Sequence, residues 1–390
     1  MDRKDIALHR AAFTGVTYGV LREAERQSRI VDVGWKTALV AHARQMRRLA
    51  TEAIRYGNHC SATQYLLDAA AAYQAATYTL DEPVRNDLES TTRLRRLAVH
   101  CYRKAAANGV NCTPLVIETA GESACGYWRA PVAAPKGVVV LLNGLDSLCE
   151  AEMHVFAGFM LERNLATLAI DLPAQFSSPG RHPDFQVERW APALTDLIHQ
   201  RAGHVPIGAF GVSFGGYLVA RLLSCTSFFA AGLMVSPPAW LSPEQRQHPF
   251  LTQMLSWTLG TTDDAEIDRA ALGITLGGLE PPKVPCTLYT MSGDRLFGPE
   301  HARAYREWGA SRLEEINIAA EHVGTSTFHY WLPAAFDRLA YLLQRTHNVR
   351  EKVPQRGDGG GGLGADGLDP GGSDRPEPDP IQPGQAAAGG

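Results

Sequence analysis

The stretch IGAFGVSFGGYLVARLL, residues 207–223, decides the fold class because one serine stands at the junction of two patterns. IGAFGV before Ser213 is a continuous apolar run typical of a buried strand, and GYLVARLL after it begins an amphipathic helix. Residues 211–215 satisfy G-x-S-x-G, in which a sharp strand-to-helix turn lifts the serine hydroxyl above the sheet edge. The chain has no phosphate-loop motif, and no dinucleotide-type glycine motif follows the first strand. The stretch therefore predicts a nucleophilic serine.

The segment around this turn, residues 111–350, alternates short β-type runs with helical runs. Several of the runs, such as GVVVLLNG and LATLAIDLP, are continuously apolar, as expected for strands buried on both faces. This pattern predicts an α/β domain with a mostly parallel sheet flanked by helices. The connection at about 239–283 is too long for a plain crossover, and we expect it to contain a short helical lid insertion.

The two ends of the chain differ from this middle segment. Residues 1–110 are alanine-rich, and their apolar residues recur every three or four positions, which predicts an N-terminal all-helical domain. Residues 351–390 are rich in glycine and proline and hold almost nothing apolar, so we expect a disordered tail.

A serine hydroxyl becomes a good nucleophile when a histidine removes its proton and a carboxylate orients that histidine. After such an elbow the acid precedes the histidine in the chain. Asp294 follows the strand CTLYTMSG and is the predicted acid, although an aspartate after glycine also forms ordinary turns. His322 follows the last strand and is the predicted base; His329, seven residues later, is the alternative.

The substrate oxygen also needs hydrogen-bond donors where negative charge develops. Two backbone N–H groups are candidates: that of Phe214, at the helix N-terminus, and that of Leu145, in the loop after GVVVLLNG. The alternative for Asn143-Gly144 is an ordinary turn.

Composition points to a small-molecule substrate. The chain has 390 residues, 45% of them hydrophobic, and a net charge of −4, which argues against nucleic acid or an anionic membrane as the main partner. No apolar run is long enough to span a bilayer, and the first residues lack the apolar core of a signal peptide, so we expect a cytoplasmic protein.

Metal and cofactor chemistry have little support in the sequence. The seven cysteines are scattered, with no C-x-x-C pair, and indicate reduced thiols. No His-Glu-x-x-His motif occurs. We interpret Glu150, Glu152 and His154 as the polar face of a helix, and we expect neither a metal nor a cofactor.

Four segments together resemble the α/β-hydrolase superfamily: LLNGLDSLCEAE, GVSFGGYLVARL, SGDRLFGPE and AEHVGTS. The helical segment SATQYLLDAAAAYQAATYTL makes the chain similar to the subgroup of FrsA-like esterases and 2,6-dihydroxypseudooxynicotine hydrolases. This resemblance implies a serine hydrolase with its pocket between the sheet edge and the helical domain, and a homodimer. It also implies an auxiliary acid in the region of Glu244, a residue that an exposed helix N-terminus explains equally well.

Several functions remain open from the sequence. The leading hypothesis is hydrolysis through an acyl-enzyme on Ser213, either of an ester or of a C–C bond in a β-dicarbonyl or acyl-aromatic, polyketide-like compound. An alternative is an acyltransferase or cyclase in a biosynthetic pathway that uses the same three residues. The third is a non-enzymatic regulatory protein, against which the retention of all three residues argues.

Overall fold

The computed structural model describes residues 3–28, 34–78, 87–119, 121–171, 185–225 and 227–352. Residues 1–352 form one compact unit. The predicted disordered tail lies outside the described residues from position 353 onward. The predicted boundary between a helical domain and a catalytic domain at residue 110 stays a prediction.

Five helices precede the sheet: α1 (Arg3–Phe13), α2 (Tyr18–Ser28), α3 (Gly34–Arg55), α4 (His59–Ala75) and α5 (Leu88–Asn108). Helix α4 packs against both α3 and α5. Its alanines at 69–72 are all buried, because a helix enclosed on several sides has room only for small side chains. The indole of Trp35 in α3 donates a hydrogen bond of 3.0 Å to the carbonyl of Ala75 and joins these helices.

The described residues form an eight-stranded sheet with the order β1-β2-β4-β3-β5-β6-β7-β8. Strands β1 and β2 pair antiparallel at one edge, β2 also pairs antiparallel with β4, and the remaining pairs are parallel. The mostly parallel sheet predicted from the sequence is therefore confirmed. The strands are β1 (Thr113–Thr119), β2 (Glu122–Arg129), β3 (Val138–Leu142), β4 (Ala166–Ile170), β5 (Ile207–Val212), β6 (Phe229–Val235), β7 (Cys286–Met291) and β8 (Leu313–Ile318).

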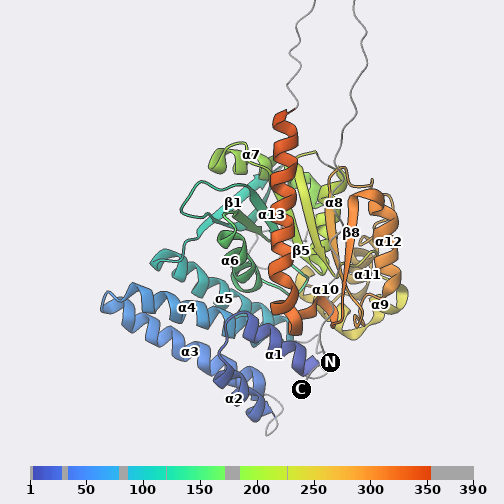
Figure 1. Ribbon diagram of the computed structural model, residues 1–390. Coiled ribbons are helices and arrows are strands. Elements are labelled where there is room, and N and C mark those ends of the chain that lie inside the picture. Colours follow the sequence, from blue (N-terminus) through green and yellow to red (C-terminus); the bar gives the residue numbers. More distant parts are fainter. Residues whose placement is uncertain are drawn as a thin grey trace, which may run out of the picture. The chain divides into compact units, whose positions relative to one another are not determined.

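Helices cover both faces of the sheet (Figure 1). The α-helices that follow β3 are α6 (His154–Glu162), α7 (Ala191–Ala202), α8 (Phe214–Cys225), α9 (Pro243–Gln247), α10 (Pro249–Leu259), α11 (Asp264–Leu272), α12 (Pro299–Gly309) and α13 (Phe328–Lys352). Helices α9, α10 and α11 occupy the segment in which a lid was expected. Short π and 3₁₀ turns also occur: η2 (Cys149–Met153), η3 (Val187–Trp190), η4 (Ala310–Arg312) and η5 (His322–Thr327).

The two faces of the sheet build two cores, as the two-residue period of a strand requires. In β3, Val139 and Leu141 face the core that contains α6, α13 and residues of α1, α3, α4 and α5. Val138, Val140 and Leu142 face the other core, with α7, α8, α10 and α12. The N-terminal helices thus share a hydrophobic core with one face of the sheet.

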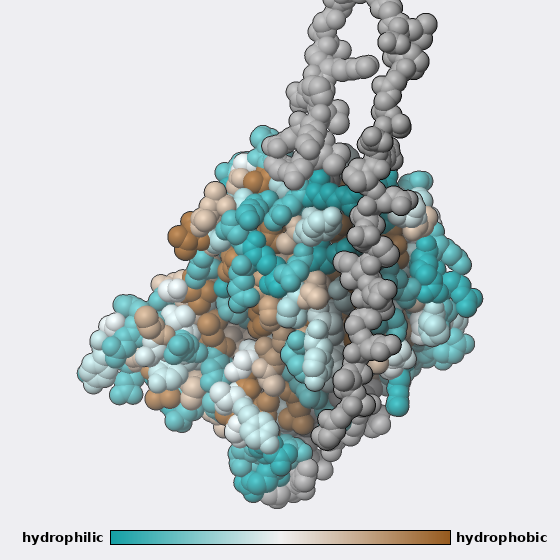
Figure 2. Space-filling view, in the orientation of Figure 1, coloured by the Kyte–Doolittle hydropathy of each residue, from teal (hydrophilic) through white to brown (hydrophobic). Residues whose placement is uncertain are grey.

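The face of the molecule in Figure 2 carries hydrophilic and hydrophobic residues. Hydrophilic residues cover the region of α12, and hydrophobic residues gather in the middle of this face. None of the described helices is both long enough and apolar enough to cross a bilayer.

Candidate active site

The elbow predicted at Ser213 lies between β5 and α8, at the carboxyl end of the strand. Ser213 has φ of 54°, a left-handed conformation that is strained for a residue with a side chain. Backbone hydrogen bonds hold it there: Ser213 N donates to the carbonyl of Val235 at 2.7 Å, and Gly216 N donates to the carbonyl of Ser213 at 2.8 Å. A Cβ on Gly215 would overlap the carbonyl of Leu142, so only glycine allows α8 to approach β3 this closely.

The structure brings Ser213, His322 and Asp294 together. His322 Nε2 lies 3.0 Å from Ser213 Oγ, and His322 Nδ1 lies 2.7 Å from Asp294 Oδ2. Asp294 is the more enclosed of the pair, with 3% of its side chain exposed against 17% for His322. The spacing is that of a nucleophile, a base and an orienting acid joined by hydrogen bonds.

The surroundings of Asp294 keep it ionised. Burial alone would raise its pKa, but the attraction of His322, their hydrogen bond and the N–H groups of Phe297 and Leu296 outweigh burial and lower the pKa. Both N–H groups donate to Oδ1, at 3.0 and 2.9 Å, which leaves Oδ2 for His322. An ionised Asp294 accepts the Nδ1 proton, so His322 Nε2 is free to accept the Ser213 proton.

His322 begins the short 3₁₀ turn η5, directly before α13. The carboxylate of Glu321 accepts hydrogen bonds from Thr325 Oγ1, Ser326 N and Ser326 Oγ at 2.8, 2.9 and 2.6 Å. These bonds fix the turn and with it the position of the imidazole. The alternative base, His329, is exposed on α13 and does not line the cavity described below.

The predicted oxyanion donors, Leu145 and Phe214, lie in the turn after β3 and at the start of α8. Within the described residues, the N–H groups of Leu145 and Phe214 have no hydrogen-bond partner. Ser147 N closes a turn on the carbonyl of Gly144 at 3.4 Å, and a Cβ placed on Gly144 would lie 3.7 Å from Ser213 Cβ. The turn formed by residues 143–148 therefore passes directly beside Ser213; because it carries the predicted oxyanion donor Leu145, it is here called the oxyanion turn.

Four helices outside the sheet hold the oxyanion turn. From α1, Arg10 binds the carboxylate of Asp146 at 2.5 Å and that of Glu152 at 2.8 Å. The side chain of Gln74, in α4, donates to the carbonyl of Asp146 at 2.9 Å, and Arg95, in α5, donates to the same oxygen at 3.3 Å. From α10, the hydroxyl of Thr258 lies 2.7 Å from the carbonyl of Leu145.

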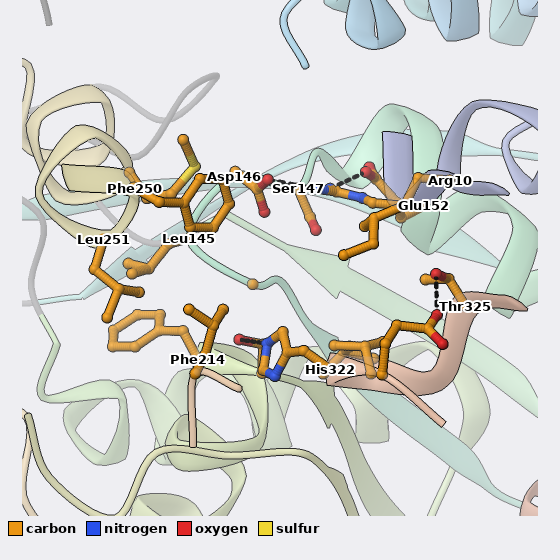
Figure 3. A pocket seen from close by; sticks show the side chains of 18 of the residues that line it. Arg10, Leu145, Asp146, Ser147, Glu152, Phe214, Phe250, Leu251, His322 and Thr325 are labelled. Carbon is orange, nitrogen blue, oxygen red and sulfur yellow. Dashed lines mark hydrogen bonds and ion pairs between the residues drawn. The ribbon is translucent and has the colours of Figure 1, made fainter. Parts of the chain in front are cut away.

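A cavity of about 470 Å³ lies over Ser213 and His322. Residues of α1, the oxyanion turn, α10 and the loops after β7 and β8 line it. Figure 3 shows that its two sides differ in chemistry. Apolar side chains, including Leu145, Phe214, Phe250 and Leu251, occupy one side, and polar side chains, including Arg10, Glu152 and Thr325, occupy the other.

Comparison with known proteins supports the sequence resemblance. A family model described as Esterase FrsA-like matches residues 35–228. Esterase FrsA of Vibrio cholerae serotype O1 is 28% identical over 169 residues, which are 41% of this chain and 39% of the relative. Esterase FrsA of Enterobacter sp. (strain 638) is 28% identical over 203 residues, 47% of this chain and 45% of the relative. The match thus spans less than half the length of these curated relatives.

Solved structures decide the fold. The crystal structure of 2,6-dihydroxy-pseudo-oxynicotine hydrolase superposes with a TM-score of 0.75 at 19% identity, covering 86% of this chain and 95% of that one. The chain has the α/β-hydrolase fold. Wild-type AbyA5 is also similar, with a TM-score of 0.61 at 15% identity over 81% of this chain and 88% of that one.

One predicted residue of this α/β-hydrolase fold lies away from the site. Glu244 is exposed in the first turn of α9 and does not line the cavity. Hydrogen bonds with its own backbone N–H and with Ser242 lower its pKa, so it is ionised near neutral pH and holds no proton to donate. Ser242 and Gln245 form a capping box around it, which accounts for this sequence without a catalytic role.

Other residues of the site were missed or misinterpreted from the sequence. Glu150 and Glu152 are buried in the π-helical turn η2, and they do not form the polar face of a helix as predicted. Glu152 accepts from Tyr78 at 2.8 Å and from Leu148 N at 3.0 Å, in addition to Arg10. The turn η2 is not exposed because α4, α5 and β4 pack against it, and sequence spacing alone does not reveal these contacts.

The described residues contain no group of three or more His, Cys, Asp or Glu side chains arranged to hold a metal ion.

Proposed function

We propose that this chain is a serine hydrolase that cleaves an acyl bond through an acyl-enzyme on Ser213. The observation that carries the proposal is the placement of His322 between Ser213 Oγ, at 3.0 Å, and Asp294 Oδ2, at 2.7 Å. Serine attacks the substrate carbonyl while its proton moves to His322 Nε2. Asp294 stabilises the imidazolium that forms, because its carboxylate is ionised and bound to Nδ1.

The same geometry supports both halves of the reaction. The oxygen of the tetrahedral intermediate would accept hydrogen bonds from the Leu145 and Phe214 N–H groups, which are not committed elsewhere in the described structure. His322 then gives its proton to the leaving group, whose bond to the acyl carbon breaks. In the second half, His322 takes a proton from water, and the hydroxide attacks the acyl carbon. The bond from that carbon to Ser213 Oγ then breaks, and His322 returns the proton to Ser213.

We propose esters as the first substrate class. The similarity to Esterase FrsA-like proteins supports this choice, and an alkoxide leaving group needs only the proton of His322. The cavity has the volume of a small-molecule site, and its apolar side suits a hydrocarbon or aromatic body of the substrate.

C–C bond hydrolysis is the second candidate, supported by the polar side of the cavity. A carbanion leaving group must be delocalised into a second carbonyl, and that oxygen needs polar groups near it. Arg10, Asp146 and Glu152 line the cavity and are candidates for this environment. Glu244 is not, because it lies outside the cavity.

The proposal is tested by labelling the protein with a fluorophosphonate and locating the adduct by mass spectrometry. We expect an adduct on Ser213 and none in Ser213→Ala, while His329→Ala is labelled like the wild type. Absence of the adduct in folded wild-type protein would refute the proposal. Turnover of a p-nitrophenyl ester against a β-diketone then separates the two bond types.

Product mass separates hydrolysis from acyl transfer or ring closure. Hydrolysis adds one water to the substrate, whereas capture of the acyl-enzyme by a hydroxyl or amine of the substrate does not. A cyclised product without added water would show that the protein is a cyclase and not a hydrolase. Ser213 would still be the nucleophile in that case.

A further inference from the structure

Arg295 is a cation of the cavity wall that the reaction outlined above does not use. It follows Asp294 in the loop after β7, and it lines the cavity. It is also exposed, so it lies where the cavity opens to solvent. Its side chain makes no hydrogen bond or ion pair within the described residues. The guanidinium of Arg295 is therefore available to a ligand that enters the cavity.

The other charged side chains of the cavity wall already have partners. Both terminal nitrogens of Arg10 bind carboxylates, those of Asp146 and Glu152. The carboxylate of Glu321 accepts hydrogen bonds from its own turn, η5, and does not pair with Arg295. Among the described residues that line the cavity, Arg295 is thus the cation that no carboxylate balances.

Hydrogen bonds fix the loop that carries Arg295. Before it in the chain, Asp294 Oδ1 accepts from Leu296 N and Phe297 N at 2.9 and 3.0 Å. After it, the carbonyl of Leu296 accepts from the side chain of Gln245, in α9, at 2.7 Å. The backbone on both sides of Arg295 is therefore held in place, in the same loop as the acid that binds the proposed base. A group bound to Arg295 would lie beside the reaction centre.

We propose that Arg295 binds a carboxylate of the substrate, and that the protein selects acyl compounds that carry a carboxylate over neutral ones. The inference rests on the proposed function, since it takes the cavity over Ser213 to be the reaction site. A guanidinium offers two parallel N–H groups that match the two oxygens of a carboxylate. One cation balances one negative charge, which favours a carboxylate over a phosphate monoester with nearly two. The apolar side of the cavity remains for the hydrocarbon part of the same substrate.

The experiment compares p-nitrophenyl hexanoate, which is neutral, with two esters that carry a carboxylate. The mono-p-nitrophenyl ester of adipic acid has it on the acyl chain, and 5-hexanoyloxy-2-nitrobenzoate has it on the leaving group. For each charged ester we would measure the ratio of its kcat/KM to that of the neutral ester. We expect Arg295→Gln to lower this ratio about fivefold for one of the two, which shows the part of the substrate that Arg295 binds. Arg295→Lys, which keeps the charge without the paired N–H groups, should lie between.

Added salt gives a readout that a purely structural role of Arg295 would not change. Because Arg295 is exposed, its attraction for a carboxylate is screened by salt. The wild-type ratio should therefore fall between about 0.01 M and about 1 M NaCl, and the ratio in Arg295→Gln should stay nearly constant. Arg303→Gln is the matched control: Arg303 is exposed on α12 and does not line the cavity, so the change removes the same charge and should keep the wild-type ratios.

Three results would overturn the proposal: unchanged ratios for both charged esters in Arg295→Gln, an equal fall in Arg303→Gln, or a wild-type protein that cleaves only the neutral ester. Equal losses for all three esters would also overturn it, because they would indicate a disturbed Asp294. Labelling with a neutral fluorophosphonate distinguishes this failure from failure of the proposed function. If wild-type Ser213 is labelled and the ratios do not change, only the role of Arg295 fails. If Ser213 is not labelled, the proposed function fails as well.

Discussion

The side chain of Gln74, in the N-terminal helix α4, donates a hydrogen bond of 2.9 Å to the backbone carbonyl of Asp146, in the turn beside Ser213. Gln74 is fully buried, and its Oε1 has no partner in the described structure. Burying an amide that is only half satisfied is costly, and alanines surround it in α4. The contact joins two regions 72 residues apart in the chain, and it implies that α4 helps to position the oxyanion turn.

Gln74→Leu tests this positioning role. The change keeps the approximate size of the side chain and removes its hydrogen bond to Asp146. We expect kcat to fall by about tenfold with little change in KM. The Leu145 N–H would be held less firmly and would stabilise the negative charge of the transition state less, whereas substrate binding depends little on this donor. The measurement is steady-state kinetics with a p-nitrophenyl ester, together with urea unfolding to show that the fold is intact.

The control for this change is Gln45→Leu on helix α3, where Gln45 is exposed and accepts a hydrogen bond from Arg48. It should leave kcat unchanged. An unaltered kcat in Gln74→Leu, or an equal fall in both variants, would show that α4 does not act on the turn.

The ion pairs of Arg10 predict a strong effect on stability. Arg10, Asp146 and Glu152 have side chains that are 16%, 20% and 7% exposed, so removing the cation leaves two poorly solvated carboxylates. We expect Arg10→Met to lower the free energy of unfolding by about 3 kcal/mol. Arg10→Met combined with Glu152→Gln should recover part of the loss, because one uncompensated charge is then removed. Urea unfolding of the three variants measures the effect, and a double variant less stable than Arg10→Met would contradict it.

Glu150 predicts a pH dependence of stability. Burial, and then the nearby charge of Asp171, raise the pKa of Glu150 above its ordinary value of 4.5. The folded state therefore holds this proton at pH values where the unfolded state has released it, and stability falls as pH rises from about 4.5 to the raised pKa. Tyr127, which donates to Glu150 at 2.5 Å, can also donate to a glutamine at this position.

We accordingly expect Glu150→Gln to lose less thermal stability than the wild type between pH 5 and pH 8. Differential scanning fluorimetry at the two pH values measures the difference. Glu118→Gln, at an exposed position on β1, is the control and should follow the wild type. The prediction would be contradicted if the Tm of Glu150→Gln fell between pH 5 and pH 8 by as much as the Tm of the wild type.

The fold, and the approach of Asp294 and His322 to Ser213, could be predicted because their signals are local. A strand, a serine between glycines and a helix define the turn at Ser213, and Asp294 and His322 each follow a strand of a parallel sheet, whose carboxyl ends meet at one edge. The support of the oxyanion turn could not be predicted in this way. Arg10 and Asp146 are 136 residues apart, and nothing in the sequence near either residue specifies the partner.

For Glu244, in contrast, the sequence held a local signal against the predicted role. Ser242-Pro-Glu-Gln245 has the spacing of a capping box, which favours an exposed helix start over an acid inside a pocket. Glu150 and Glu152 were misplaced for a different reason. Charged residues normally lie on the exposed face of a helix, and Glu150 and Glu152 are buried here because helices α4 and α5, which are distant in the chain, pack against η2.

The final prediction compares Asp294→Asn with Glu244→Gln. In Asp294→Asn the Oδ1 atom can still accept from Leu296 N and Phe297 N, so the amide nitrogen would face His322 Nδ1. That nitrogen is a donor, and it would favour the tautomer with the proton on Nε2, which cannot accept the Ser213 proton. We expect kcat to fall by about 10⁴-fold, the order found when the acid of such a triad is replaced by its amide, while KM changes little. Glu244→Gln should keep wild-type kcat, because Glu244 is exposed and outside the cavity. Kinetics with a p-nitrophenyl ester, supported by circular dichroism of both variants, measure the contrast. A folded Asp294→Asn protein with more than a tenth of wild-type kcat would mean that His322 is oriented by something other than Asp294.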